Sequence, residues 1–92
     1  MNTEEIAEFV KSRDESLVHF VETGSLTKVR QHCRKYGVTM PEDRTVLKLG
    51  LLKAVQECTD ISDEIKAKAA DKALKMGFCP YMFPGRRADD QN

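Results

Sequence analysis

The sequence contains no tryptophan, and none of its apolar runs reaches the roughly 20 residues that a membrane-spanning helix needs. Cysteine is scarce as well: Cys33, Cys58 and Cys79 are odd in number and widely spaced. This pattern disfavours a disulfide framework and favours reduced thiols in a cytoplasm. Because the first 24 residues are acidic, we expect neither a signal peptide nor a transit peptide, and no membrane partner.

The net charge is zero, because fifteen basic residues balance fifteen acidic ones. A neutral chain has no bulk field that would attract nucleic acid or an anionic membrane. The charges are nevertheless segregated, since residues 1–24 are mainly acidic. Residues 25–37 have no acidic residue and four basic ones, Lys28, Arg30, Arg34 and Lys35. We expect the two segments to attract each other within the fold, with a ligand-binding surface as the alternative.

What the sequence does contain is helical periodicity. With 92 residues, 40% of them hydrophobic and 33% charged, it fits one small globular domain with a single core. The apolar positions predict a compact all-α domain of four helices joined by short connections, so that sequential helices pack antiparallel. The expected helices are residues 4–22, 26–36, 42–58 and 63–76. The domain is expected to span residues 1–83, followed by a polar, disordered tail at 84–92.

Single glycines and a proline punctuate these helices. Gly37 follows a basic amphipathic run and predicts a left-handed C-cap, and Gly77 predicts the end of the fourth helix. Pro41, followed by Glu42 and Asp43, predicts the first turn of the third helix. The segment between Gly37 and Glu42 is thus expected to be an elbow that determines the fold.

The third expected helix is apolar around most of its circumference, which is typical of a buried, central helix. Gly50 in its middle costs about 1 kcal/mol relative to alanine, and we expect close approach of another helix there. The predicted core is formed by one apolar face of each helix: Ile6, Phe9, Val10, Leu17, Phe20, Val29, Cys33, Tyr36, Leu47, Leu51, Val55, Ile65, Ala69 and Ala73.

Two polar residues interrupt the apolar faces. Arg13 falls inside the stripe of the first helix, so it must reach water, an acid or helix-end carbonyls. We interpret it as a structural clamp on a neighbouring element, with an anion site as the alternative. His32 lies at the edge of the second apolar face and is interpreted as a boundary residue rather than a ligand or a base.

The end of the domain is rich in aromatic residues. Residues 78–84 contain Phe78, Tyr81 and Phe83, and the prolines Pro80 and Pro84 in the same segment forbid a regular helix or a central strand. These side chains either cover one end of the core or present an apolar surface to a partner.

Residues suited to catalysis or metal binding are scattered. The histidines and cysteines lack metal-ligand spacing, so no metal and no cofactor are expected. His32 and Cys33 are neighbours, and adjacent residues on a helix point apart, which disfavours a nucleophile–base pair. We therefore expect a protein that is not an enzyme.

The second and third expected helices, with their elbow, suggest a helix-turn-helix DNA-binding unit. In that interpretation Arg44, Thr45 and Lys48 would enter the major groove. The elbow, however, is longer than the usual three- to four-residue turn, and the basic footprint of a DNA-binding protein is missing.

Three stretches of the sequence resemble a known group of proteins: SRDE at 12–15, RKYGVTMP at 34–41 and MGFCPY at 76–81. They are similar to segments of small helical proteins of Gram-positive bacteria and their phages, a family without an established activity. The resemblance implies a compact helical fold and an origin in a mobile element.

The hypothesis that follows is a non-catalytic protein-interaction module, such as a phage accessory or inhibitory protein. The residues expected to contact a partner are those of a basic face and an aromatic end: Lys28, Arg34, Lys35, Tyr81 and Phe83. The alternatives are DNA binding, and self-association through the apolar circumference of the third helix.

Overall fold

The computed structural model describes residues 2–77 of the chain. This part contains four α-helices: α1 (Thr3–Thr23), α2 (Thr27–Tyr36), α3 (Arg44–Glu57) and α4 (Asp63–Lys75). This confirms the expected all-α, four-helix fold. The expected aromatic segment and the polar tail at 84–92 lie outside the described residues, as do Tyr81 and Phe83.

The helix ends follow from local capping chemistry. Asp43 caps α3 by accepting a hydrogen bond from the Val46 amide at 3.0 Å, and Ser62 caps α4 in the same way. Gly37 has a φ of 66° and ends α2 in the predicted left-handed conformation. The prediction that Pro41 opens α3 is wrong, because the Asp43 carboxylate sets the start at Arg44.

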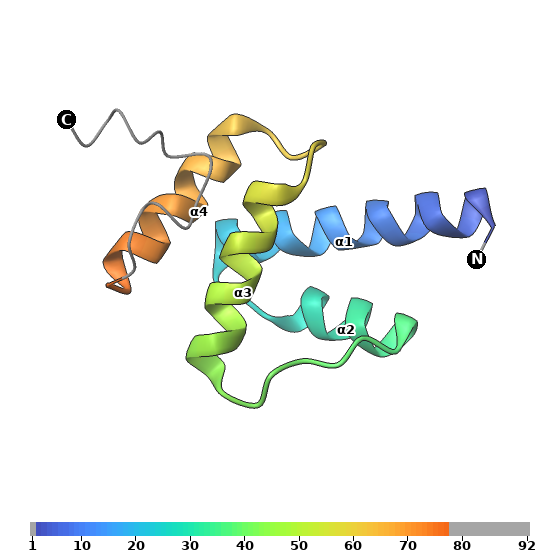
Figure 1. Ribbon diagram of the computed structural model, residues 1–92, viewed down its shortest axis with the longest axis horizontal. Coiled ribbons are helices and arrows are strands. Elements are labelled where there is room, and N and C mark those ends of the chain that lie inside the picture. Colours follow the sequence, from blue (N-terminus) through green and yellow to red (C-terminus); the bar gives the residue numbers. More distant parts are fainter. Residues whose placement is uncertain (1, 78–92) are drawn as a thin grey trace.

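The helices form two hairpins, α1–α2 and α3–α4, and α1 also packs against both helices of the second hairpin. In Figure 1, α1 lies along the long axis of the molecule, α2 runs back beside it, and α3 crosses toward α4. α1 packs against each of the other three helices, most extensively against α2, while α3 packs most extensively against α4. The molecule measures 45 × 28 × 20 Å. The helix that packs against all the others is therefore α1. The prediction that the third helix is the central one is wrong.

The core lies where the hairpins meet. Its buried apolar residues are Leu17, Phe20, Val21, Leu26, Val29, Cys33, Leu47, Leu52, Val55, Cys58, Ile61, Ile65, Ala69, Ala70 and Ala73. Nine of the fourteen predicted core residues are in this set: Leu17, Phe20, Val29, Cys33, Leu47, Val55, Ile65, Ala69 and Ala73.

Of the other five, Leu51 is partly buried and packs against the core, whereas the remaining four predictions were wrong in the same direction, toward more exposure than expected. Ile6 is 50% exposed, and four further side chains are only partly buried: Phe9, Val10, Tyr36 and Leu51. Ile6, Phe9 and Val10 lie in the first half of α1. The 10-residue α2 is too short to cover the 21-residue α1 along its whole length. The apolar stripe of α1 therefore continues beyond the core.

α3 is not buried on all sides either. Val46 in its first turn is 53% exposed. Gly50 is also exposed, and a Cβ built on it would have no atom within 4 Å. The expected close approach of another helix at Gly50 is therefore wrong.

Candidate functional site

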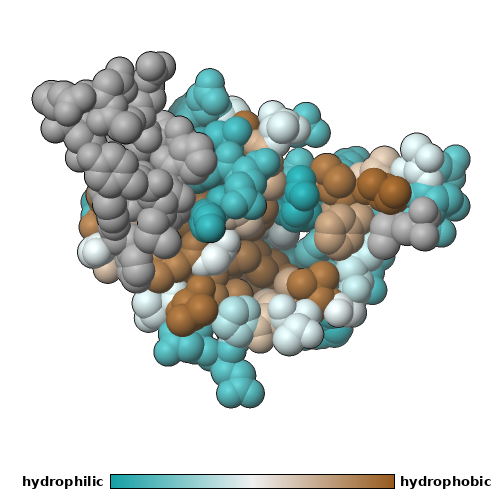
Figure 2. Space-filling view, in the orientation of Figure 1, coloured by the Kyte–Doolittle hydropathy of each residue, from teal (hydrophilic) through white to brown (hydrophobic). Residues whose placement is uncertain are grey.

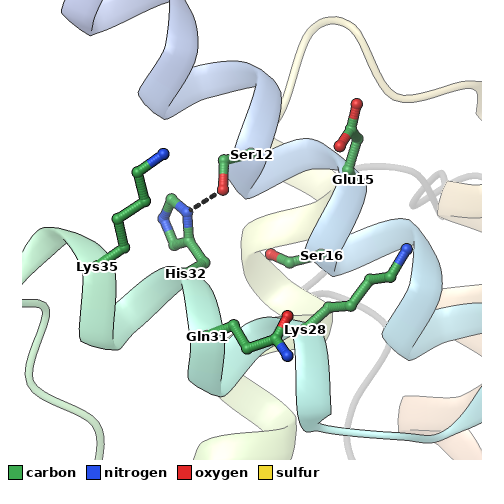
Figure 3. A pocket seen from close by; sticks show the side chains of 7 residues that line it. All are labelled: Ser12, Glu15, Ser16, Lys28, Gln31, His32 and Lys35. Atoms are coloured by element: carbon green, nitrogen blue, oxygen red, sulfur yellow. Dashed lines mark hydrogen bonds between the residues drawn. The ribbon is translucent and has the colours of Figure 1, made fainter.

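A surface groove of about 280 Å³ lies between α1 and α2. Figure 3 shows the side chains that line it: Ser12, Glu15 and Ser16 from α1, and Lys28, Gln31, His32 and Lys35 from α2. Two helices running in opposite directions place these residues together, although they lie up to two dozen positions apart in the sequence. We take this α1–α2 groove as the candidate site.

His32 forms the floor of the groove and is only 7% exposed. Its Nδ1 is 2.8 Å from the Ser12 hydroxyl, which links α2 to α1. The imidazole also contacts two aromatic rings, with centroid distances of 4.9 Å to Phe9 and 5.0 Å to Tyr36. Phe9 and Tyr36 meet edge to face at 5.0 Å. The three rings fix the open end of the hairpin, so His32 is a buried interhelical residue and not the boundary residue that the sequence suggested.

The surroundings of His32 disfavour its protonated form. Burial lowers the pKa of His32 below its usual 6.5, and the nearby cations Arg13 and Lys35 lower it further. The imidazole is therefore mainly neutral at pH 7. Two cations therefore lie close enough to the imidazole to disfavour a further positive charge on it.

Lys28 and Lys35 flank His32 on the α2 wall of the groove. They are seven residues apart, about 10 Å along the helix, and therefore on one face. Figure 3 shows both side chains reaching toward α1, one on each side of His32. The Lys35 ammonium lies 5.3 Å from the centre of the Tyr36 ring. Neither lysine forms an ion pair with a carboxylate among the residues that the structure describes.

The α1 wall contributes groups of a different kind. Ser16 is buried, and its hydroxyl donates to the Arg13 carbonyl at 2.8 Å, so it is already used within the helix. Glu15 is exposed at the rim and gives the α1 wall one negative charge. An acidic ligand is therefore favoured along the α2 wall, where the lysines are.

The Ser12–His32 pair has the residue types of a nucleophile and a base. In a hydrolytic triad a carboxylate orients the histidine, and amide donors stabilise the oxyanion. His32 has neither partner among the described residues, and its recorded contacts are with Ser12 and the two rings. The pair acts chemically as an interhelical hydrogen bond.

The remaining site predictions are distributed over the surface. Arg34 is exposed on α2, and Arg44 and Thr45 are exposed in the first turn of α3, beside the capping carboxylate of Asp43. Lys48 is partly buried beside Phe20, Leu52 and Met76. The structure therefore does not bring the basic face of α2 and the start of α3 into one groove.

Arg13 finds its acid next to it in the sequence. Its guanidinium lies 3.1 Å from the carboxylate of Asp14. Both residues belong to α1, and they lie close enough to Cys58 at the end of α3 to influence the pKa of its thiol.

Cys33 and Cys58 are free thiols in the core, and burial raises the pKa of both. A buried, protonated thiol is a weak nucleophile and a poor metal ligand. Within residues 2–77, no three His, Cys, Asp or Glu side chains lie close enough together to hold a metal ion. Of the four helices described, none combines the length and apolarity that crossing a bilayer requires.

Ser12 and the ring cluster were not predicted as site residues. The available signal was the position of Ser12 and His32, each at the edge of an apolar face, where the polar edges of neighbouring helices meet. Comparisons with protein-family models, curated proteins and solved structures found no match. Function therefore has to be inferred from the geometry of the chain itself.

Proposed function

We propose that this protein is a non-catalytic interaction module that binds an acidic segment of another protein along the α1–α2 groove. The observation that carries the proposal is the pair of lysines, Lys28 and Lys35, held on one wall of the groove without an ion-pair partner among residues 2–77. Two lysines seven residues apart, about 10 Å along the axis of α2, match carboxylates spaced two turns apart on a partner helix.

The rest of α2 supports an acidic partner. The helix contains no acidic residue, and its other two cations, Arg30 and Arg34, are also exposed. Protein carboxylates are bound through such charge complementarity, which speeds association and selects partners more than it raises affinity. The Phe9–His32–Tyr36 cluster joins the two helices that form the groove.

The setting of this function is part of the same proposal. Free cysteines suit a reducing compartment, so we place the protein in a cytoplasm. The sequence resemblance to small phage-associated proteins favours an accessory or inhibitory role for a mobile element.

DNA binding is the second candidate, because Arg44 and Thr45 are exposed in the first turn of α3. The carboxylates of Glu42 and Asp43 lie directly before that turn and would repel phosphates. This arrangement favours the groove over α3 as the binding surface.

The test is fluorescence polarisation with a labelled amphipathic helical peptide that carries glutamates two turns apart. We expect salt-sensitive binding that the double substitution Lys28→Ala/Lys35→Ala weakens about 10-fold, since two exposed ion pairs contribute about 1 kcal/mol or somewhat more. Lys53→Ala on α3 is the matched control, because Lys53 is also an exposed helical lysine.

The proposal is wrong if the peptide does not bind at low salt, or if Lys53→Ala weakens binding as much as the double substitution does. A random-sequence DNA duplex is titrated in parallel. Tighter binding of the duplex, lost on Arg44→Ala, would replace the proposal with the DNA-binding alternative.

A further inference from the structure

The first half of α1 extends beyond the body of the molecule. In Figure 1 it projects away from α3 and α4, and α2 ends beside it. Residues 2–8 are all exposed, whereas Leu17, Phe20 and Val21 in the second half are buried. Figure 2 shows hydrophobic side chains at the same projecting end.

These exposed apolar residues continue the face that builds the core. Ile6, Val10 and Leu17 follow each other at four and seven residues, which is helical spacing on one side of α1. α2 covers one side of Phe9, whereas Ile6 stays half exposed and Val10 partly exposed among the described residues. An incompletely covered apolar stripe that is in phase with the core is the surface that a further helix would bury.

We infer that this stripe packs against the same stripe of a second copy, with the two α1 helices antiparallel about a two-fold axis near Ile6. The inference deepens the proposed function, on which it rests, because it names one acidic segment that the basic α2 helix receives. That segment is the beginning of α1 in the other copy.

Charge complementarity selects a second copy as the occupant. Glu4, Glu5 and Glu8 are exposed around the projecting end of α1. An antiparallel pairing carries this acidic end toward the other molecule's α2, whose last turn holds the exposed cations Arg34 and Lys35. The two-fold axis repeats the contact, so each copy supplies one acidic end and one basic end.

Glu5 is the acid best placed for this contact. It lies one turn before Phe9, whose ring contacts Tyr36 of α2. Glu5 therefore lies on the side of α1 that faces α2, but beyond the point where α2 ends. In the antiparallel pair the α2 sides of both α1 helices are adjacent, which brings Glu5 of one copy toward Lys35 of the other.

The experiment is sedimentation velocity of the full chain over a range of concentrations. We expect a reversible dimer with a dissociation constant on the order of 10 μM, because the apolar area is small. Ile6→Ser raises that constant by about 100-fold, since the lost burial is counted once in each copy. Val46→Ser is the matched control, because Val46 is equally exposed but lies on α3, and it leaves the constant unchanged.

A charge exchange tests the orientation. Glu5→Lys and Lys35→Glu each weaken the dimer when alone, but an equimolar mixture of the two variants forms a heterodimer with both ion pairs restored. Failure of the mixture to associate more strongly than either variant would overturn the antiparallel arrangement.

The peptide assay separates the inference from the proposed function. A chain that stays monomeric at high concentration but binds the acidic peptide overturns the inference alone. A chain that neither dimerises nor binds the peptide overturns the inference and the proposed function together. A dimer that Ile6→Ser leaves intact, or that Val46→Ser weakens equally, also overturns the inference. Circular dichroism of Ile6→Ser confirms the fold, which an exposed position leaves unchanged.

Discussion

The two hairpins of this molecule are built from the same kind of helix but meet through different chemistry. Between α3 and α4 the contact is mainly apolar, because Leu52, Val55, Ala69 and Ala73 are almost completely buried in the same core. One polar contact crosses it, in which the buried Gln56 donates a hydrogen bond to the Lys66 carbonyl at 2.7 Å. Between α1 and α2 the contact includes a buried histidine, a serine hydroxyl and two partly exposed rings.

The difference assigns a role to each hairpin. The small side chains of Ala69, Ala70 and Ala73 are buried and let α4 approach its neighbours closely. Between α1 and α2, the Ser12–His32 hydrogen bond lies at the floor of an open groove. We therefore regard α3–α4 as the supporting hairpin and α1–α2 as the binding hairpin.

The largest expected contrast is in stability. Leu52 is 1% exposed, so Leu52→Ala removes buried methyl groups and should lower the free energy of unfolding by about 2–5 kcal/mol. Ile6→Ala in the binding hairpin should change it by less than about 0.5 kcal/mol in the monomer, because Ile6 is half exposed. Urea unfolding at low protein concentration measures both and keeps self-association from contributing.

Val46→Ala is the control for this pair, since it shortens an exposed side chain in the supporting hairpin. It should behave like Ile6→Ala. Similar losses for Leu52→Ala and Ile6→Ala would remove the distinction between a covered and an uncovered hairpin.

An intermediate difference in stability is expected between alanine substitutions at two glycines, Gly37 and Gly50, which have opposite roles. Gly37 ends α2 with a φ of 66°, so Gly37→Ala forces a left-handed alanine and should cost about 1 kcal/mol. Gly50 lies within α3, where alanine is the better helix former, so Gly50→Ala should stabilise by up to about 1 kcal/mol.

Neither new methyl group would have an atom within 4 Å, so backbone conformation alone decides the two signs. Thermal unfolding of both variants under one buffer condition gives the comparison. A stabilising Gly37→Ala would mean that α2 does not end where the structure places its C-cap.

The positions of the helices were predictable because their causes are local. Glycines at C-caps, Ser62 at an N-cap and the phase of apolar residues act within a few positions of the chain. Even the start of α3 was missed by only two residues. Pro41 and Asp43 are both common at helix starts, and the structure uses the Asp43 carboxylate as the N-cap.

The extent of burial was not predictable in the same way. The stripe of α1 runs in phase from Ile6 to Val21, and nothing in its periodicity shows where the neighbouring helices stop covering it. That depends on the length of α2 and on the register of the hairpin. The same register brings Ser12 to His32 across 20 residues, which is why the groove could not be seen in the sequence.

The smallest expected effect is a pH dependence of folding stability, which comes from His32 in the α1–α2 hairpin. Burial, Arg13 and Lys35 lower the pKa of His32 in the folded protein, whereas the unfolded chain has the ordinary value of 6.5. Below that value the unfolded state binds more protons, so stability should fall as pH decreases through 6.5 toward the folded pKa of His32, and level off below it. Above 6.5 the contribution of His32 is constant.

His32→Gln should remove this part of the pH dependence, although it also lowers stability at every pH by disturbing the ring cluster. Lys35→Ala is the sharper variant, because it deletes one cation that disfavours the imidazolium and leaves the interface in place. An NMR titration should then show the His32 pKa moving upward toward 6.5, while Lys53→Ala leaves it unchanged. If Lys35→Ala does not raise the pKa of His32, the groove lacks the positive potential that is proposed to attract an acidic partner.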